Sequence, residues 1–387
     1  MERVGYILIA DITGYTTYLN ESELEHAKGT LTDLLELLIG HIKPPLVVSN
    51  LEGDAVFSYG LDAGFVSSQT FLEGIEDMYV AFRRAIELMV LNNTCRCNAC
   101  ANVSALDLKF FVHHGTFALQ RVVGRNELMG VDINLIHRLL KNSVTEQTGI
   151  RAYTLFTDAA RADLGFDVGE DQMIGHVEDV PDFGEIQVWV KDMHPIYEKR
   201  RHEERIEYSP EEILFTTEVE VGVPPHVLWD YINQSEIRNL IVASDRYEIT
   251  GRRDGRIGEG AVYQCYHGKK RIDQLVMEWK PFERVVLEQR LPMPGPPVRL
   301  EMDLRLTPID KGTRLTFVAA RLKGTAPMRA LTRVMLKMNA RRSREDLMAF
   351  RDKVEGDFAD RGSGELEQSA ISPDQIDAAA ASSLRAD

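Results

Sequence analysis

The hydrophobic pattern changes once along this chain of 387 residues, at a charged stretch from Glu198 to Arg205. Before it, short apolar runs alternate with long segments whose apolar residues recur about every three or four positions, which predicts strands alternating with helices. After it, many short alternating segments are followed by one long helical segment, which predicts a sheet and a closing helix. The chain is therefore expected to form two domains, at residues 1–195 and 213–354, joined by a charged linker at 196–212.

Composition and sequence pattern exclude several classes of protein. The formal net charge is −15, so long-range attraction to nucleic acid or to an anionic membrane is not expected. No apolar run reaches the roughly 20 residues that cross a bilayer, and the first residues enter a strand-like run without a charged-then-apolar leader. We expect a cytoplasmic protein with no nucleic-acid partner and no membrane span. Residues 355–387 are acidic and rich in Ser and Ala, which predicts a disordered tail.

The first domain is predicted to be α+β. Long helices are expected at residues 23–42 and 69–91, and the expected order is β-α-β-β-α-β-β-α. One hairpin is expected to turn at Glu52-Gly53-Asp54 and a second around His114-Gly115. Two hairpins separated by helices are typical of a ferredoxin-like sheet with covering helices.

Two aspartates are expected at one end of this sheet. Asp11 ends the first strand, Asp54 lies at the tip of the first hairpin, and glycines (Gly14 and Gly53) flank both. Paired carboxylates are ligands for hard divalent cations. The segment that follows, residues 12–16, leads into a helix whose backbone N–H groups can receive phosphate. Considered singly, each aspartate is also an ordinary helix-cap or turn residue.

Four segments follow one another in the first domain: ILIADITGYT (7–16), NLEGDAVFSYG (50–60), FFVHHGTFALQRVVG (110–124) and ELMGVDINLIHRLLKN (127–142). In this order and spacing they resemble the catalytic domain of class III nucleotidyl cyclases, and the resemblance covers about residues 5–192. The resemblance implies conversion of a nucleoside triphosphate to a 3′,5′-cyclic nucleotide and pyrophosphate with two Mg²⁺ or Mn²⁺ ions at each site.

The resemblance also implies a role for individual residues. Asp11, Asp54 and the carbonyl of Ile12 would bind the metals. Asn134 would orient the ribose, and Arg138 would stabilise the charge that develops on the α-phosphate. In this family the metal ligands and the Asn/Arg pair come from different subunits, which implies a homodimer with two equivalent sites.

Three positions depart from the family pattern. The family's purine-reading Lys is Asn50 here, its polar partner is Glu127, and its phosphate-binding Lys aligns near Tyr153, with Arg151 as a replacement. The domain therefore either reads another base or binds a nucleotide without converting it. The nucleotide-contacting residues implied by the resemblance are Thr13, Gly14, Tyr15, Thr16, Asn50, Gly53, Glu127 and Arg151.

Three of the four cysteines lie together, as Cys95, Cys97 and Cys100. A Cys-x-x-Cys pair with a third thiolate nearby is a candidate Zn²⁺ site, for which His113, His114 or a residue of a partner chain would supply the fourth ligand. The alternative is three free thiols on a surface loop.

The second domain resembles the START-like (SRPBCC, polyketide cyclase/dehydrase) helix-grip fold. The resemblance rests on its strand pattern and on a long last helix with an apolar stripe at Leu331, Val334, Met335 and Met338. Such folds enclose an apolar cavity, which implies a hydrophobic small molecule as ligand. A filled core that serves only as a regulatory or dimerisation platform is the alternative.

Three functions remain open on the sequence alone. The first is a cyclase regulated by its START-like domain, and the second is a nucleotide-binding module without turnover. The third is a carrier of hydrophobic ligands with a vestigial first domain. The same two-domain arrangement is similar to a group of uncharacterised bacterial proteins.

Overall fold

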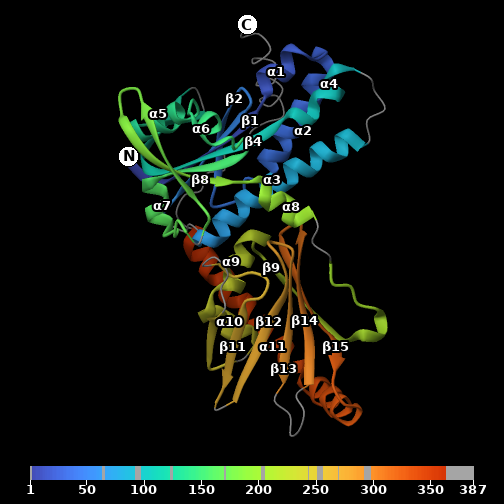
Figure 1. Ribbon diagram of the computed structural model, residues 1–387. Coiled ribbons are helices and arrows are strands. Elements are labelled where there is room, and N and C mark those ends of the chain that lie inside the picture. The colour runs from blue at the N-terminus through green and yellow to red at the C-terminus, as the bar shows by residue number, and fades with distance from the viewer. Residues whose placement is uncertain are drawn as a thin grey trace. The chain divides into compact units, whose positions relative to one another are not determined.

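The computed structural model describes residues 2–62, 66–91, 97–122, 125–169, 171–201, 205–242, 244–250, 256–268, 270–291 and 298–362. The chain divides into two compact units, Met1–Glu203 and Glu204–Glu365 (Figure 1). In the described residues no helix is both long and apolar enough to cross a membrane.

The first unit is built on one mixed sheet. Within the described residues its strands run in the order β2-β3-β1-β4-β6-β8-β7, with β5 paired to β4. Its elements are β1 (Glu2–Thr13), α1 (Tyr15–Asn20), α2 (Leu24–His41), β2 (Val47–Glu52), β3 (Ala55–Leu61), α3 (Ser68–Leu91), α4 (Asn98–Asn102), a 3₁₀ turn (Val103–Ala105), β4 (Asp107–Val122), β5 (Arg125–Met129), α5 (Val131–Leu139), α6 (Val144–Thr148), β6 (Tyr153–Thr157), α7 (Asp158–Leu164), β7 (Ile174–Val180), β8 (Gly184–Asp192) and α8 (His194–Arg201).

The centre of this sheet has the ferredoxin-like order. Strands β2, β3, β1 and β4 are neighbours in that sequence, and each adjacent pair is antiparallel. Helix α2 connects β1 to β2, and α3 connects β3 to β4, as a β-α-β-β-α-β unit requires. The α+β prediction is confirmed.

Alternation along β1 separates two apolar layers. Tyr6, Leu8 and Ala10 belong to the core formed with α2 and α3, whereas Ile7 and Ile9 belong to the core formed with α5. Because successive strand residues point to opposite faces, Asp11 shares the α5 face with Ile7 and Ile9. The sheet therefore directs this carboxylate away from the two long helices.

The second hairpin lies elsewhere than expected. Strand β4 runs without a turn through His114-Gly115, where it pairs with β1 (Gly5 opposite Gly115), and the chain turns only beyond Val122 to form β5. A Cβ on Gly115 would collide with the carboxylate of Asp132. This glycine therefore permits close approach of α5 to the strand rather than a turn, and the prediction of a turn there is wrong.

The charged stretch after the first sheet begins as a helix. In α8 the Tyr197 side chain is buried and its hydroxyl donates to Glu87 at 2.6 Å. Arg200 pairs with Asp77 at 3.2 Å, and Arg201 pairs with Glu87 at 2.8 Å. These contacts fix α8 to α3, so this part of the expected linker belongs to the first unit.

The second unit is one antiparallel sheet with helices. In the described part of the chain its strands run in the order β10-β11-β12-β13-β14-β15-β9. Its elements are a 3₁₀ turn (Pro210–Glu212), β9 (Ile213–Val221), α9 (Pro225–Asn233), α10 (Ser235–Val242), β10 (Arg246–Thr250), β11 (Val262–His267), β12 (Lys270–Lys280), β13 (Arg284–Leu291), β14 (Val298–Ile309), β15 (Gly312–Lys323) and α11 (Ala326–Gly362).

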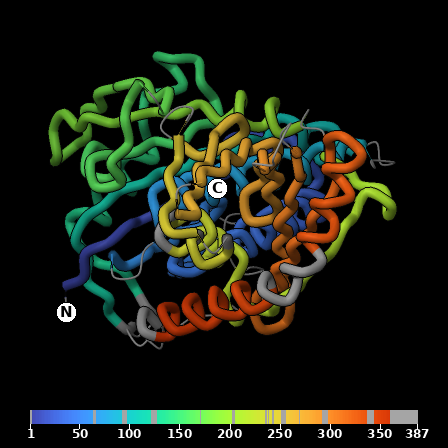
Figure 2. Tube along the Cα trace, turned by 90° about the horizontal axis from the view of Figure 1, so that it is seen from below, coloured from blue at the N-terminus to red at the C-terminus, as the bar shows by residue number. Residues whose placement is uncertain are grey.

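The fully buried apolar residues of the last helix, α11, lie in its C-terminal half. Leu347, Phe350 and Val354 are buried in the core of the second unit, and α11 contacts β9 and α10. Figure 2 shows the course of α11, which is coloured orange to red toward its C-terminal end. The stripe expected to pack lies nearer the N-terminus, and its described members, Leu331, Val334 and Met335, are exposed. The helix also continues to Gly362, eight residues into the segment expected to be disordered; residues 363–387 lie outside the described part.

A segment that we term the strap (residues 205–212) ends in the 3₁₀ turn and lies on the outer face of the second sheet. The N–H of Ile206 donates to Glu278 at 2.8 Å, and its carbonyl accepts from Arg284 at 2.7 Å. Arg284 lies 5.9 Å from the Tyr208 ring centroid. Glu278 and Arg284 are almost fully buried. The strap therefore supplies hydrogen-bond partners to both members of a buried ion pair.

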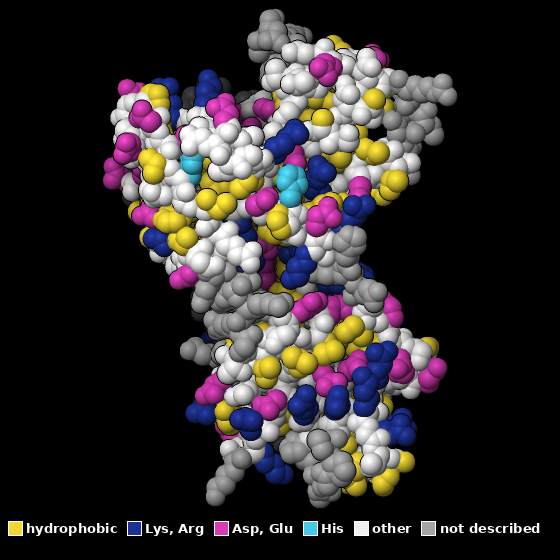
Figure 3. All heavy atoms as spheres, in the orientation of Figure 1, with side chains coloured by type: hydrophobic (Ala, Val, Ile, Leu, Met, Phe, Trp, Pro, Cys, Tyr) yellow, Lys and Arg dark blue, Asp and Glu magenta, His cyan; other side chains and the backbone are white. Residues whose placement is uncertain are grey.

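Beyond the strap, charges of both signs alternate on this unit. Figure 3 shows Lys and Arg side chains among Asp and Glu on its visible face. Two cross-strand pairs illustrate the pattern: Lys323 with Glu301 at 2.8 Å, and Arg299 with Glu288 at 3.7 Å. Pairing of opposite charges between neighbouring strands supports the register of the sheet.

Candidate functional site

The two predicted metal-binding aspartates meet at the end of β1. Asp11 lies opposite Ala55 on β3, and Ala55 is the residue that follows Asp54 in the chain. The N–H of Ile12 donates to the Asp54 carbonyl at 3.3 Å. Gly53 has a φ of 65°, which allows the two-residue turn that places Asp54 there. Both aspartate side chains are half-buried.

Each carboxylate is held in an unfavourable environment for its charge. Burial raises the pKa of Asp11, an effect that the nearby Lys109 ammonium partly offsets. Burial and then the charge of Asp11 raise the pKa of Asp54 to about 7. A divalent cation bound between the two carboxylates would relieve both effects, and carboxylate oxygens are the donors that Mg²⁺ and Mn²⁺ take. The residues present therefore fit such ions.

Sequence reasoning missed Lys109 as a member of the site. It lies on β4 directly opposite Asp11, with its ammonium 5.0 Å from the Tyr153 ring centroid. Burial lowers its pKa, Asp11 raises it, and the positive charge of Arg151 lowers it again. A lysine in an otherwise apolar strand was the available signal, but only the strand register shows that it faces Asp11.

The raised pKa of Asp54 predicts a pH-dependent stability. A carboxyl with a folded-state pKa near 7 adds stability that is complete below its ordinary value and is lost as the pH rises through 7. Asp54→Asn should therefore raise the melting temperature of the first unit more at pH 8 than at pH 5, measured by calorimetry with a chelator. Equal differences at the two pH values would contradict the assignment.

The segment expected to receive phosphate contributes mainly to the core. Ile12 and Tyr15 are buried in the layer with α2 and α3, whereas Thr13 is half-buried and Thr16 exposed. Gly14 has a φ of 86° and precedes α1, a helix of 6 residues. The short helix and the buried Tyr15 leave the backbone of the loop, rather than these side chains, available to a ligand.

The Asn/Arg pair lies on the outer surface of α5. Asn134 and Arg138 are exposed, and Arg138 is 3.5 Å from Asp182 in the β7–β8 turn. In the described residues no hydrogen bond or ion pair joins either side chain to Asp11 or Asp54. One chain therefore presents the carboxylates and the Asn/Arg pair separately.

The positions that depart from the family pattern come from three parts of the first unit. Asn50 on β2 donates to Glu52 at 2.9 Å, and Glu127 is exposed on β5, a strand that lies beside β2. Arg151 precedes β6 and is exposed, close enough to Lys109 to influence its pKa. The strands that carry the expected base-reading positions are thus neighbours.

A buried network that sequence reasoning missed orients α5. His113 on β4 lies 2.8 Å from the Thr157 hydroxyl and 3.4 Å from Asp132 on α5. The same Asp132 accepts from the N–H of Thr116 at 2.6 Å. These contacts fix the first turn of the helix that carries Asn134.

The cysteine cluster has a histidine partner other than those expected. Cys97, Cys100 and His26 of α2 have ligand atoms within 4.8 Å of one another, whereas Cys95 lies outside the described residues. His113 binds Thr157, and His114 lies 3.0 Å from Asp62, so the described structure places both away from the cysteines. Neither histidine is the fourth ligand.

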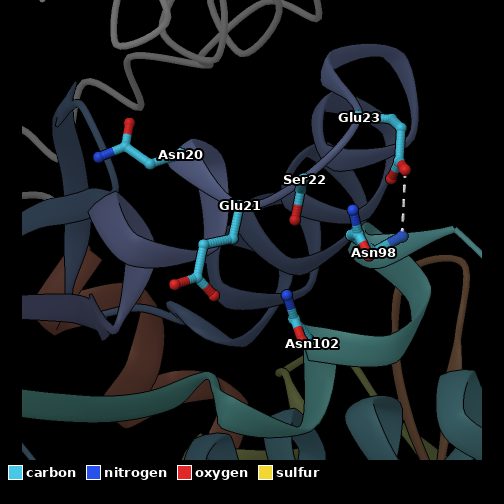
Figure 4. Close-up of a pocket in the computed structure, with 6 residues that line it drawn as sticks. All are labelled: Asn20, Glu21, Ser22, Glu23, Asn98 and Asn102. Carbon is cyan, nitrogen blue, oxygen red and sulfur yellow. Dashed lines mark hydrogen bonds between the residues drawn. The ribbon is translucent and has the colours of Figure 1, made fainter.

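An open hollow of about 540 Å³ adjoins this cluster. It lies between the α1–α2 connection and α4, as Figure 4 shows. Its lining is polar and consists of Asn20, Glu21, Ser22, Glu23, Asn98 and Asn102.

Two family models match parts of the chain. One, described as "Protein of unknown function (DUF2652)", matches residues 31–148. The other, described as "Polyketide cyclase / dehydrase and lipid transport", matches residues 212–355. Among curated proteins, an uncharacterised protein of Mycobacterium tuberculosis is 34% identical over 128 residues, 33% of this chain and 57% of that protein. The chain thus spans little more than half the length of this relative.

Similar solved structures fall into two groups. The adenylyl cyclase CyaB of P. aeruginosa is 15% identical over 50% of this chain and 95% of that chain, with a TM-score of 0.36. A bacterial light-regulated adenylyl cyclase is 14% identical over 52% and 57%, with a TM-score of 0.38. A protein of Mesorhizobium loti is 18% identical over 36% and 96%, with a TM-score of 0.30. The second unit is a START-like domain, and adenylyl cyclases are among the solved structures similar to the chain.

Proposed function

We propose that the first unit is a homodimeric, two-metal nucleotidyl cyclase. The observation that carries the proposal is the meeting of Asp11 and Asp54 at the end of β1, where burial raises the pKa of both carboxyls and the charge of Asp11 further raises the pKa of Asp54. Two half-buried carboxylates whose pKa values are raised favour a bound divalent cation. The motif order in the sequence supports a triphosphate as the second ligand.

In this proposal the two aspartates and the Ile12 carbonyl would hold two Mg²⁺ or Mn²⁺ ions. Two such ions would supply the charge that lowers the pKa of the ribose 3′-hydroxyl and neutralises the triphosphate. In the proposed reaction the 3′-hydroxyl would give its proton to water, and its oxygen would bond to the α-phosphorus while the bond to the β-phosphate oxygen breaks, which would release pyrophosphate. Lys109 and Arg151 add positive charge beside the carboxylates, where they would attract the polyphosphate.

The position of two side chains on α5 supports the proposed dimer. Among the described residues, Asn134 and Arg138 are exposed, and neither is joined by a hydrogen bond or an ion pair to the carboxylates of its own chain. A two-fold partner would supply them to the facing site, where the Asn would orient the ribose and the Arg would stabilise charge on the α-phosphate.

For the second unit we propose a hydrophobic small molecule as ligand, with regulation of the first unit as its role. The match to a family model whose description includes lipid transport supports the ligand class. A filled core without a ligand remains the competing proposal, since large side chains such as Trp229, Tyr231 and Tyr263 are fully buried there.

A second candidate function for the first unit is nucleotide binding without turnover. Its support is Asn50, whose amide is engaged by Glu52 at 2.9 Å where the family has a base-reading Lys. Such a module would bind a nucleotide with metal and release no product.

Incubation with each of ATP, GTP, CTP and UTP, with Mn²⁺ or Mg²⁺, tests both candidates. We expect mass spectrometry to find one cyclic nucleotide and pyrophosphate. Metal-dependent nucleotide binding by calorimetry without any product would establish the second candidate instead. Absence of both product and binding would overturn both.

A further inference from the structure

The cluster of His26, Cys97 and Cys100 lies outside the proposed catalytic site and joins two helices. His26 belongs to the first turn of α2, whereas Cys97 and Cys100 begin α4. The His26 Nδ1 lies 3.1 Å from the Cys97 Sγ, and all three ligand atoms lie within 4.8 Å. Around a tetrahedral ion with bonds of about 2.0–2.3 Å, ligand atoms are roughly 3.3–3.8 Å apart.

The backbone at the cysteines already has the form of a metal-binding turn. Cys97 is the N-cap of α4, and its sulfur accepts the N–H of Cys100 at 3.4 Å. This bond brings the sulfur of residue 97 over the first turn of α4, toward residue 100. N–H donation to sulfur also stabilises the thiolate form that a metal requires.

Glu23 fixes this turn to the start of α2. One of its carboxylate oxygens accepts the N–H of Asn98 at 3.2 Å (Figure 4), and the other accepts the N–H of Ala99 at 3.1 Å. Because Glu23 lies three residues before His26, the same segment positions the histidine and anchors the cysteine turn. Glu23 therefore helps to hold His26 of α2 close to the two cysteines of α4.

We propose that His26, Cys97 and Cys100 bind one Zn²⁺ ion that fixes α4 to α2. Two thiolates and one imidazole are the donors that select zinc over Mg²⁺ or Mn²⁺, which take oxygen ligands. Two thiolates balance the charge of the ion, so the site is neutral as a whole. A fourth coordination position remains for a further ligand. This ion is structural and separate from the metals proposed at Asp11 and Asp54.

Zinc content of the full-length protein tests the site. After equilibration with Zn²⁺ under reducing conditions and removal of excess metal, mass spectrometry of the elements should find one zinc per chain. His26→Ala, Cys97→Ser and Cys100→Ser should each weaken zinc binding by about a hundredfold or more, measured against a competing chelator. His41→Ala is the matched control, because His41 lies at the other end of α2 and should leave zinc content unchanged.

Substitution with Co²⁺ gives a second readout that is independent of activity. The wild-type protein should show the absorption of a thiolate-to-cobalt charge-transfer band, which Cys97→Ser should reduce and His41→Ala should keep. A protein without zinc, or one whose zinc survives all three substitutions, would overturn the proposal. A Cys97–Cys100 disulfide in protein kept under reducing conditions would do the same.

Discussion

Asparagine in place of Asp54 should lower the rate of cyclic-nucleotide formation by about a thousandfold or more, a loss of about 4 kcal/mol of transition-state stabilisation. The amide has no negative charge to hold a divalent cation and leaves Asp11 alone at the end of β1. The fold should survive, because the substitution removes a half-buried charge whose pKa is raised. Initial rates by mass spectrometry and thermal unfolding on the same preparation measure both effects.

Asp33→Asn provides the control for this substitution. Asp33 is exposed on α2, so the same chemical change there should leave both rate and melting temperature unaltered. A rate retained by Asp54→Asn in a folded protein would refute the two-metal mechanism. An equal loss in Asp33→Asn would show that the assay reports something other than the carboxylate pair.

Two inactive chains should restore activity when they share a dimer. Asp54→Asn removes the metal site of one chain, and Arg138→Ala removes the residue that this chain's partner offers. If each site takes its metals from one subunit and its arginine from the other, a mixed dimer contains one intact site. Mixed dimers isolated with two different affinity tags should therefore turn over at about half the wild-type rate.

The matched control pairs Asp54→Asn with Asp11→Asn. Both substitutions damage the carboxylate pair, so neither chain of that mixed dimer has a metal site and the activity should stay at background. Recovery in both mixtures would point to exchange artefacts. Recovery in neither, with Arg138→Ala inactive alone, would contradict a site shared between subunits.

The sequence predicts the frame of the first unit and one part of its site. Apolar runs and helical stripes suffice for the β-α-β-β-α-β order, because each element is specified by its own periodicity. Asp11 and Asp54 were predictable as neighbours, since one ends a strand and the other occupies a hairpin turn that pairs directly with that strand.

Two predictions from the sequence are wrong because contacts between distant segments determine the structure there: the turn at Gly115 and the packed stripe of the last helix. Gly115 follows the usual pattern of a turn, yet its lack of a side chain serves the approach of Asp132 within a straight strand. The residues Leu331, Val334 and Met335 of α11 are apolar but exposed, whereas Leu347 and its neighbours are buried, because α11 packs against β9 and α10.

Lys109 and His26 could not be found from local pattern. Lys109 faces Asp11 because of the register between β1 and β4, although 98 positions separate the two residues in the chain. His26 and Cys97 are separated by 71 positions. A long sequence separation leaves no periodic signal, so such pairs emerge only once the sheet and the helices are placed.

The strap has a consequence for dissecting the protein. The family-model match begins at residue 212, but the partners of the buried Glu278 and Arg284 include the backbone of Ile206. A fragment cut at the start of the matched segment would strip that backbone from two buried charges. We therefore expect a fragment of the second unit that folds by itself to begin at or before residue 205, ahead of the residue at which the family match begins.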